Sequence, residues 1–200
     1  MRFAPTTFRP TFGRVLSVIV AIVAALGILS FVVSGDVATV LRSSWGLVLM
    51  TAIAFALFWF PSVRVAEDKI TVRNVFSTVQ VPWSAIQNVD TKYALTITTA
   101  SGKVTAWASP APNRYAAQVG NTADARLAAS ATGPAVRPGD LLSTASGAPA
   151  YVIRRHWEEL REDGVFEARA DDVAVTRNVH WNTIGVLGAL TLATALGVLL

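Results

Sequence analysis

The chain contains only two histidines, and histidine is the side chain best suited to acid-base chemistry or metal binding near neutral pH. His156 is followed by a tryptophan and two glutamates, and it lacks the second histidine at helical spacing that a helical zinc motif requires. His180 stands alone beside Trp181, a pair more typical of an anchor at a membrane surface than of a binding site. The histidines therefore predict no metal site.

Carboxylates gather in two places in the C-terminal third of the chain. Catalysis by paired carboxylates needs an enclosed pocket that gives them different pKa values, and neither cluster implies one, so we interpret both as solvated surface. The glycine at position 102 opens GKVT, which lacks the phosphate-binding loop pattern, and no G-x-S-x-G motif is present. We predict no catalytic residue and no cofactor, and hence a non-enzymatic protein. The clustered acids are Glu158, Glu159, Glu162 and Asp163, then Glu167, Asp171 and Asp172.

The chain has no cysteine, which excludes disulfides, thiolate metal sites and cysteine nucleophiles. For the same reason the sequence does not indicate whether the protein is in an oxidising or a reducing compartment. It is 52% hydrophobic and only 15% charged, unlike a soluble domain, in which about a quarter of residues are charged. The apolar residues are concentrated in three runs, at residues 15–33, 45–60 and 184–200. The first run, nineteen residues without a charge, would extend about 28 Å as a helix, close to the thickness of a hydrocarbon core.

The three runs carry no ionisable residue, so we interpret them as membrane anchors and not as a transport pathway. Residues 1–61 are expected to form an N-terminal arm and a two-helix transmembrane hairpin, and residues 184–200 a third span. An alternative for the first run is a cleaved signal peptide, which also has a basic start and an apolar middle.

The distribution of charge predicts how the spans are oriented. Three arginines precede the first span, while the hairpin loop holds Arg42 and the opposing Asp36. Because positively charged flanks stay inside, the N-terminus and residues 61–183 are expected in the cytoplasm of an inner (plasma) membrane protein and the C-terminus outside. Residues 61–183 hold thirteen Lys and Arg against twelve Asp and Glu, so the net charge of +4 predicts no nucleic-acid partner. The three N-terminal arginines are Arg2, Arg9 and Arg14.

From about residue 63 to 108 the pattern changes to alternating β-branched and polar residues, which predicts strands. Strands are expected at residues 69–75, 78–81, 93–99 and 104–108, forming one small antiparallel sheet of four or five strands. A short turn at residues 82–89 would direct Trp83, Ile86 and Val89 inward. Such a sheet is near the lower limit of independent stability, so packing from elsewhere is expected.

Residues 65–114 resemble the bacterial PH-like domain of small actinobacterial membrane proteins. The resemblance is carried by the RNVF strand at residue 73, a PW pair followed by isoleucine three residues later, and the WASPAPNR segment ending at Arg114. It implies a PH-like β-domain over residues 62–114, between a membrane hairpin and a further span, with an adaptor-like role. The first strand-to-strand loop departs from a phosphoinositide-binding PH domain, because Glu67 and Asp68 alternate with its few basic residues.

Residues 115–150 are rich in alanine and are expected to form a linker with one short helix near residues 123–131. Residues 151–163 have helical periodicity, with Ile153, Trp157 and Leu160 on one face. This helix could cap the sheet, lie on the membrane or dock a partner. Its exposed side predicts ion pairs between residues 154 and 158 and between residues 155 and 159. Residues 151–183 form the last segment before the third span, with a possible extra strand at 173–179.

The sequence thus predicts a membrane α + β protein: a helical hairpin, a PH-like antiparallel β-domain with an amphipathic helix, and a C-terminal span. We expect an accessory or scaffold subunit of a larger inner-membrane complex, such as a respiratory or envelope-assembly complex, with membrane lipids and integral-membrane proteins as partners and no small-molecule substrate. An alternative is a lipid-sensing adaptor that binds anionic headgroups through Arg64, Lys69, Arg73 and Lys92. The candidate interaction residues are Arg64, Arg73, Trp83, Trp107, Arg114 and Trp157.

Overall fold

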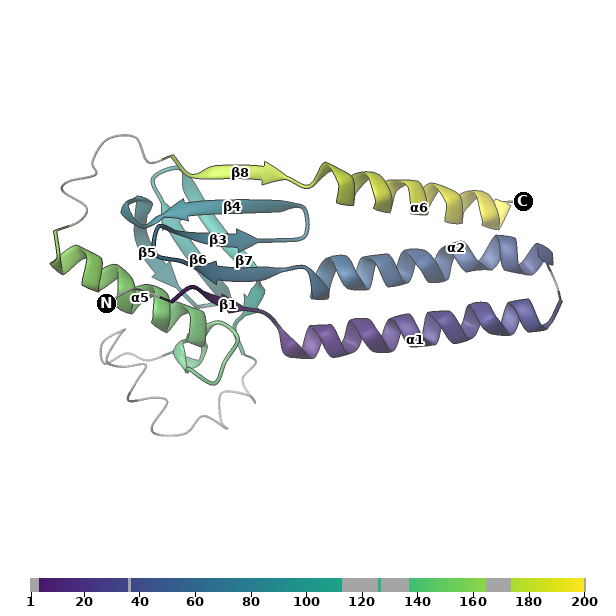
Figure 1. The fold of residues 1–200 in the computed structure, drawn as a ribbon, viewed down its shortest axis with the longest axis horizontal. Helices are drawn as coiled ribbons and strands as arrows, with labels where there is room; N and C mark the ends of the chain where they lie inside the picture. Colours follow the sequence, from purple (N-terminus) through teal and green to yellow (C-terminus); the bar gives the residue numbers. More distant parts are fainter. Residues whose placement is uncertain (1–3, 36, 113–125, 127–136, 165–173, 200) are drawn as a thin grey trace. The chain divides into compact units, whose positions relative to one another are not determined.

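The computed structural model describes residues 4–35, 37–112, 126, 137–164 and 174–199 (Figure 1). The chain divides into two compact units. We call residues 10–60 and 179–200 the helical unit, and residues 1–9 and 61–178 the β unit. Each unit is described by itself.

The helical unit consists of the three predicted spans. Helix α1 covers Thr11–Val33, α2 covers Val37–Ala54 and continues as the π-helical turn η1, Phe55–Trp59, and α6 covers Trp181–Leu199. By length and composition all three are able to cross a membrane. Helix α2 packs against both α1 and α6. The predicted hairpin and C-terminal helix are confirmed, although each helix begins before its apolar run because polar residues near its start also adopt helical conformation.

A buried serine connects α1 to the end of α2. The Ser17 hydroxyl donates to the Gly13 carbonyl oxygen at 3.0 Å and lies 3.1 Å from the Ala54 carbonyl oxygen. Ala54 is the last residue before the π turn, where the helical bonding pattern changes and its carbonyl accepts this bond from the neighbouring helix. Gly13 allows α1 and the η1 turn to pack closely, because a Cβ at this position would lie only 3.0 Å from the Phe58 Cβ.

The β unit contains two antiparallel sheets in place of the single sheet predicted. The first has the order β1-β2-β3-β4-β8 and the second β5-β6-β7. The short β1 in the N-terminal arm was not predicted, because a strand of only three residues shows too little alternation to be recognised in the sequence. The strands are β1 Thr6–Phe8, β2 Ser62–Val65, β3 Lys69–Arg73, β4 Ser77–Pro82, β5 Ile86–Asp90, β6 Ala94–Thr99, β7 Gly102–Pro110 and β8 Thr176–Val179, with a 3-10 turn η2 at Trp83–Ala85.

Alternation along the strands builds the core of the β unit. Ile70 and Val72 of β3 are buried, as are Leu95 and Ile97 of β6, while the residues between them face outward. Helix α5, Gly147–Glu162, adds Ile153 to the same cluster and packs against β2, β5 and β6 (Figure 1). Capping of the sheets by this helix, one of three predicted alternatives, is therefore confirmed.

The end of the predicted linker differs in the structure. A 3-10 turn η3 forms at Pro138–Asp140, α5 starts at Gly147, and Leu141 and Ser146 between them are buried. The small residues here allow close packing, since a Cβ at Gly139 would overlap the carbonyl oxygen of Thr91. A linker extending to residue 150 is therefore wrong for residues 137–150. Of the helix expected at 123–131, the structure describes only Arg126.

Candidate interaction surface

Three basic side chains share the outer face of the first sheet, the face turned away from the core. Arg64 of β2 pairs with Thr71 of β3, and the alternation of β3 puts Lys69 and Arg73 on the same side as Thr71. Arg64 and Arg73 are exposed and Lys69 is half-buried. We call this face, with Arg64, Lys69, Thr71 and Arg73, the basic face.

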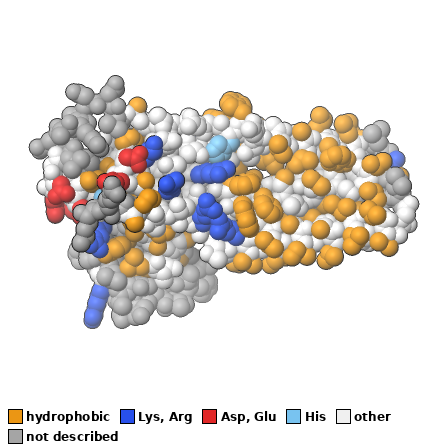
Figure 2. All heavy atoms as spheres, in the orientation of Figure 1, with side chains coloured by type: hydrophobic (Ala, Val, Ile, Leu, Met, Phe, Trp, Pro, Cys, Tyr) orange, Lys and Arg blue, Asp and Glu red, His pale blue; other side chains and the backbone are white. Residues whose placement is uncertain are grey.

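The turn between β2 and β3 places Glu67 and Asp68 near the basic face. The ammonium of Lys69 lies 3.5 Å from Asp68 Oδ2, with the two side chains 40% and 66% exposed, so solvent screens this pair strongly. Figure 2 shows Lys and Arg side chains gathered over the strands of the β unit. The face therefore presents positive potential to a partner.

Lys92 lies elsewhere, in the turn between β5 and β6 of the second sheet. Its ammonium is 5.1 Å from the centre of the Tyr93 ring, and its backbone N–H donates to Asp90 Oδ1 at 3.3 Å. The structure thus brings together Arg64, Lys69 and Arg73 of the predicted headgroup-binding set, while Lys92 belongs to a different sheet.

Trp83 is a core residue and not a contact surface. Its side chain is 4% exposed, and its indole N–H donates to the Ala66 carbonyl oxygen at 3.0 Å. The His156 ring meets it edge-on, with ring centres 4.8 Å apart. Trp83 therefore joins η2 to the β2–β3 turn and to α5, and it cannot make the partner contact that was predicted for it.

Trp107 of β7, in contrast, is 54% exposed. Its backbone N–H donates to Asn74 Oδ1 at 2.8 Å, and Asn74 Nδ2 donates to the Thr105 carbonyl oxygen at 2.8 Å. One asparagine side chain thereby attaches the β3–β4 loop to β7 and holds the backbone that carries the Trp107 indole.

Trp157 is half-buried on α5 and packs against the core, with the Arg161 guanidinium 6.0 Å from its ring centre. The part of its ring that stays exposed is available to a partner. Arg114, also predicted, lies outside the described residues.

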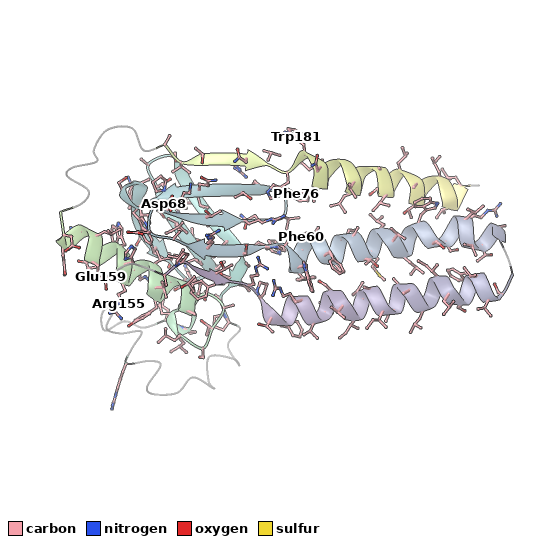
Figure 3. All side chains as sticks on the ribbon, viewed as in Figure 1. Phe60, Asp68, Phe76, Arg155, Glu159 and Trp181 are labelled. Atoms are coloured by element: carbon pink, nitrogen blue, oxygen red, sulfur yellow. The ribbon has the colours of Figure 1, made fainter. Side chains whose placement is uncertain are left out.

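The outer surface of α5 carries the predicted ion pair between Arg155 and Glu159, at 3.1 Å from Nε to Oε1 (Figure 3). Arg155 holds the pKa of Glu159 below its usual range by a hydrogen bond that outweighs the opposing effect of partial burial. The other predicted pair is wrong, because Arg154 turns inward to a different carboxylate.

That carboxylate is Asp140 of η3, which is buried and accepts hydrogen bonds from three donors. Arg154 Nη1 and the Thr91 hydroxyl each approach Oδ1 at 2.6 Å, and the backbone N–H of Arg137 donates to Oδ2 at 3.0 Å. Arg154 Nη2 also donates to the Val89 carbonyl oxygen at 2.8 Å. We call Asp140, Arg154 and Thr91 the polar clamp, because it joins α5, η3 and the end of β5.

Burial of Asp140 favours its neutral form, yet the hydrogen bonds from Thr91, Arg154 and the Arg137 backbone together hold the pKa of Asp140 below its usual range. The charged carboxylate is therefore the stable form in the folded β unit. The clamp was missed in the sequence because Asp140 lies in the alanine-rich stretch interpreted as linker. A Pro-Gly-Asp string before a helical segment was the available signal, since Pro-Gly favours a turn and aspartate is a common helix-start residue.

Within the described residues there is no group of three or more His, Asp or Glu side chains that could hold a metal ion. What the described surface of the β unit offers is a basic face, the accessible rings of Trp107 and Trp157, and a helix fixed by a buried clamp. Such features bind partners by charge and contact.

Comparison with known protein families gives a match that covers part of the β unit. Residues 60–141 match the family model described as Bacterial PH domain. The match extends beyond the predicted end at residue 114 and includes η3 and Asp140. Among curated proteins and solved structures, none matches the chain.

Proposed function

We propose that the bacterial PH domain of this chain is a non-enzymatic interaction module that its three apolar helices hold at a membrane, as an accessory or scaffold subunit of a larger inner-membrane complex. PH domains mediate protein or lipid interactions, and the family is generally non-catalytic. A protein partner with acidic residues is the occupant that the chemistry of the basic face favours.

The observation that carries this proposal is the contrast between the two sides of the first sheet. Its inner side is filled by the chain's own residues, including Ile153 of α5. The basic face opposite leaves Arg64 and Arg73 exposed. The domain therefore needs no partner to complete its core, and the surface left for a partner is charged.

The first test is purification of the full chain from native membranes in mild detergent, with quantification of the proteins that copurify. We expect a membrane-protein companion near stoichiometric amount, retained by Lys92→Glu and reduced several-fold by the double variant Arg64→Glu/Arg73→Glu. Recovery of the wild-type chain alone would refute the proposal. Equal retention by the double variant and by Lys92→Glu would exclude the basic face as the docking surface.

The proposal places the N-terminus and the β unit in the cytoplasm and the C-terminus outside, following the excess of arginine before α1. The absence of native cysteine allows single-cysteine labelling in intact cells. A membrane-impermeant maleimide should label Gly35→Cys, between α1 and α2, and label Asp68→Cys only after the cells are opened. The reverse pattern would overturn this orientation.

Lipid-surface sensing is the second candidate, favoured by the three basic side chains on one face. Its test uses the full chain in nanodiscs with or without anionic lipid. If the basic face reads anionic headgroups, anionic lipid should slow hydrogen exchange in residues 62–82, and added salt should reverse the effect. Exchange that does not change with lipid charge would exclude this function.

A further inference from the structure

One end of the first sheet carries all three connections to the apolar helices. The last residue of β1, Phe8, pairs with Val63 next to the start of β2, so the chain leaves β1 where it enters β2. Strand β8 neighbours β4 and runs opposite to it (Figure 1), so Val179 lies at this end too. We call this the connecting end of the sheet.

The connections themselves are very short. Only Arg9 and Pro10 separate β1 from α1, only Phe60 and Pro61 separate η1 from β2, and only His180 separates β8 from α6. A connection of three residue steps reaches at most about 11 Å even when fully extended. Since a spanning helix begins at the headgroup region, the connecting end must lie close to the lipid headgroups.

The β3–β4 loop, Asn74 to Phe76, is at the same end. Register pairs Ser62 with Arg73, and Arg73 with Thr78, so the loop projects beyond the first residue of β2. Its tip carries Phe76, a large apolar side chain that is 52% exposed (Figure 3).

This loop is held in a fixed conformation. The backbone N–H of Asn74 donates to the Ser77 carbonyl oxygen at 2.8 Å, and the Asn74 side chain makes its two hydrogen bonds to β7. The exposed Trp107 is carried on that same stretch of β7. An ordered loop loses little conformational entropy when its aromatic ring enters another phase.

We infer that the β3–β4 loop is a lipid-contacting anchor, with Phe76 inserted at the boundary between headgroups and acyl chains and Trp107 and Arg73 beside it. Aromatic rings and basic residues are the side chains enriched at this depth of a membrane. The occupant is the bilayer surface next to the spans. An uncharged bilayer is sufficient, which distinguishes this contact from headgroup sensing by the basic face.

Insertion of this loop would give the β unit a contact with lipid in addition to its three covalent connections to the apolar helices. This inference does not depend on the identity of any protein partner.

The test uses the full chain, without native cysteine, reconstituted in phosphatidylcholine nanodiscs. A cysteine-linked NBD fluorophore is placed at position 76 in Phe76→Cys or at position 68 in Asp68→Cys, beyond opposite ends of β3 and about 20 Å apart. Lipids carrying a nitroxide at the headgroup or at a shallow acyl position then quench the fluorophore according to depth.

We expect quenching at position 76 to exceed that at position 68 several-fold, with a blue-shifted emission. Because Phe76→Cys removes the ring, NBD at Val75→Cys keeps Phe76 in place, and adding Phe76→Ser to that protein should reduce its quenching. Equal quenching at positions 75, 76 and 68 would overturn the inference. So would quenching at position 76 that appears only when anionic lipid is added.

Discussion

Arg154 of α5 donates to the Asp140 carboxylate across 2.6 Å, with side-chain exposures of only 16% and 4%. The pair joins α5 to η3, the turn that precedes it, and through Thr91 and Val89 it joins α5 to the second sheet. A buried ion pair of this kind contributes little over a well-packed apolar pair, but its geometry admits one placement of α5. The polar clamp therefore fixes which face of the helix remains outward, including the exposed part of Trp157.

Replacing one partner of the clamp should be costly. Asp140→Asn keeps the shape but leaves the Arg154 charge buried without its counterion, a change that typically costs about 3 kcal/mol or more. Hydrogen exchange measured on the full chain should show faster opening of α5 and of the β5–β6 region. The control is Glu159→Gln on the exposed side of the same helix, where an ion pair contributes less than about 1 kcal/mol. Equal effects of the two variants would contradict the role of the clamp.

The Asp140 carboxylate also predicts that the stability of the β unit depends on pH. The folded-state pKa of Asp140 is lowered, so its charge stabilises the fold above the unfolded pKa, which is about 3.9 for aspartate. This contribution is lost as pH falls through the lower folded-state pKa. Relative to the intrinsic rate at each pH, the protection of α5 amides should thus fall below about pH 4, and the fall should be smaller in Asp140→Asn, which has no proton to gain. An identical pH profile in the two proteins would show that other groups control the acid response.

Much of the fold was predictable because its signals are local. Apolar runs predicted the spans, and alternation predicted β3, β4, β6 and β7. Ile153, Trp157 and Leu160 identified the face of α5 that packs on the core. These signals depend only on which face of each element meets an apolar phase.

The features that were missed depend on contacts distant in sequence. Strand β1 forms because Thr7 pairs with Arg64, which lies more than fifty residues later in the sequence. No local sequence pattern encodes such a pairing. Asp140 gains its role from Arg154 and Thr91. The short turn correctly predicts that Trp83 is directed inward, but no local pattern predicts its bond to the Ala66 carbonyl oxygen, and the additional expectation of a partner contact is wrong. Arg154 was expected to pair with Glu158 because helical spacing cannot reveal a better partner on another element.

The Ser17 hydroxyl should stabilise the packing of α1 on α2. Ser17→Ala leaves the Ala54 carbonyl oxygen without this donor, at a cost of about 0.5–1.5 kcal/mol. The midpoint of SDS-induced unfolding of the full chain should therefore fall. Thr191→Ala is the matched control, since that exposed hydroxyl bonds within its own helix to the Leu187 carbonyl oxygen. A fall of the same size in the control would show that the loss is not specific to the α1–α2 contact.

Close approach of α2 and α6 depends on Gly197. A Cβ there would lie 2.7 Å from the Arg42 carbonyl oxygen, whereas a Cβ at Gly188 meets nothing within 4 Å. In a protein carrying Gly46→Cys and Thr194→Cys, oxidation should form a cross-link between the two helices, since a Cβ at Gly46 lies 3.7 Å from Thr194 Cγ2. Gly197→Ala should slow cross-linking and Gly188→Ala should not. Unchanged rates in both variants would contradict the predicted contact.

We propose that the basic face of the PH domain binds a membrane-protein partner. This binding is tested most directly by placing a photo-crosslinking amino acid at Thr71, between Arg64 and Arg73, in the full chain in native membranes. Tyr93, which is 80% exposed in the turn between β5 and β6, is the control position. We expect a discrete covalent adduct with one integral-membrane protein from position 71 and none from position 93. Protein adducts absent from position 71, or identical from both positions, would contradict it.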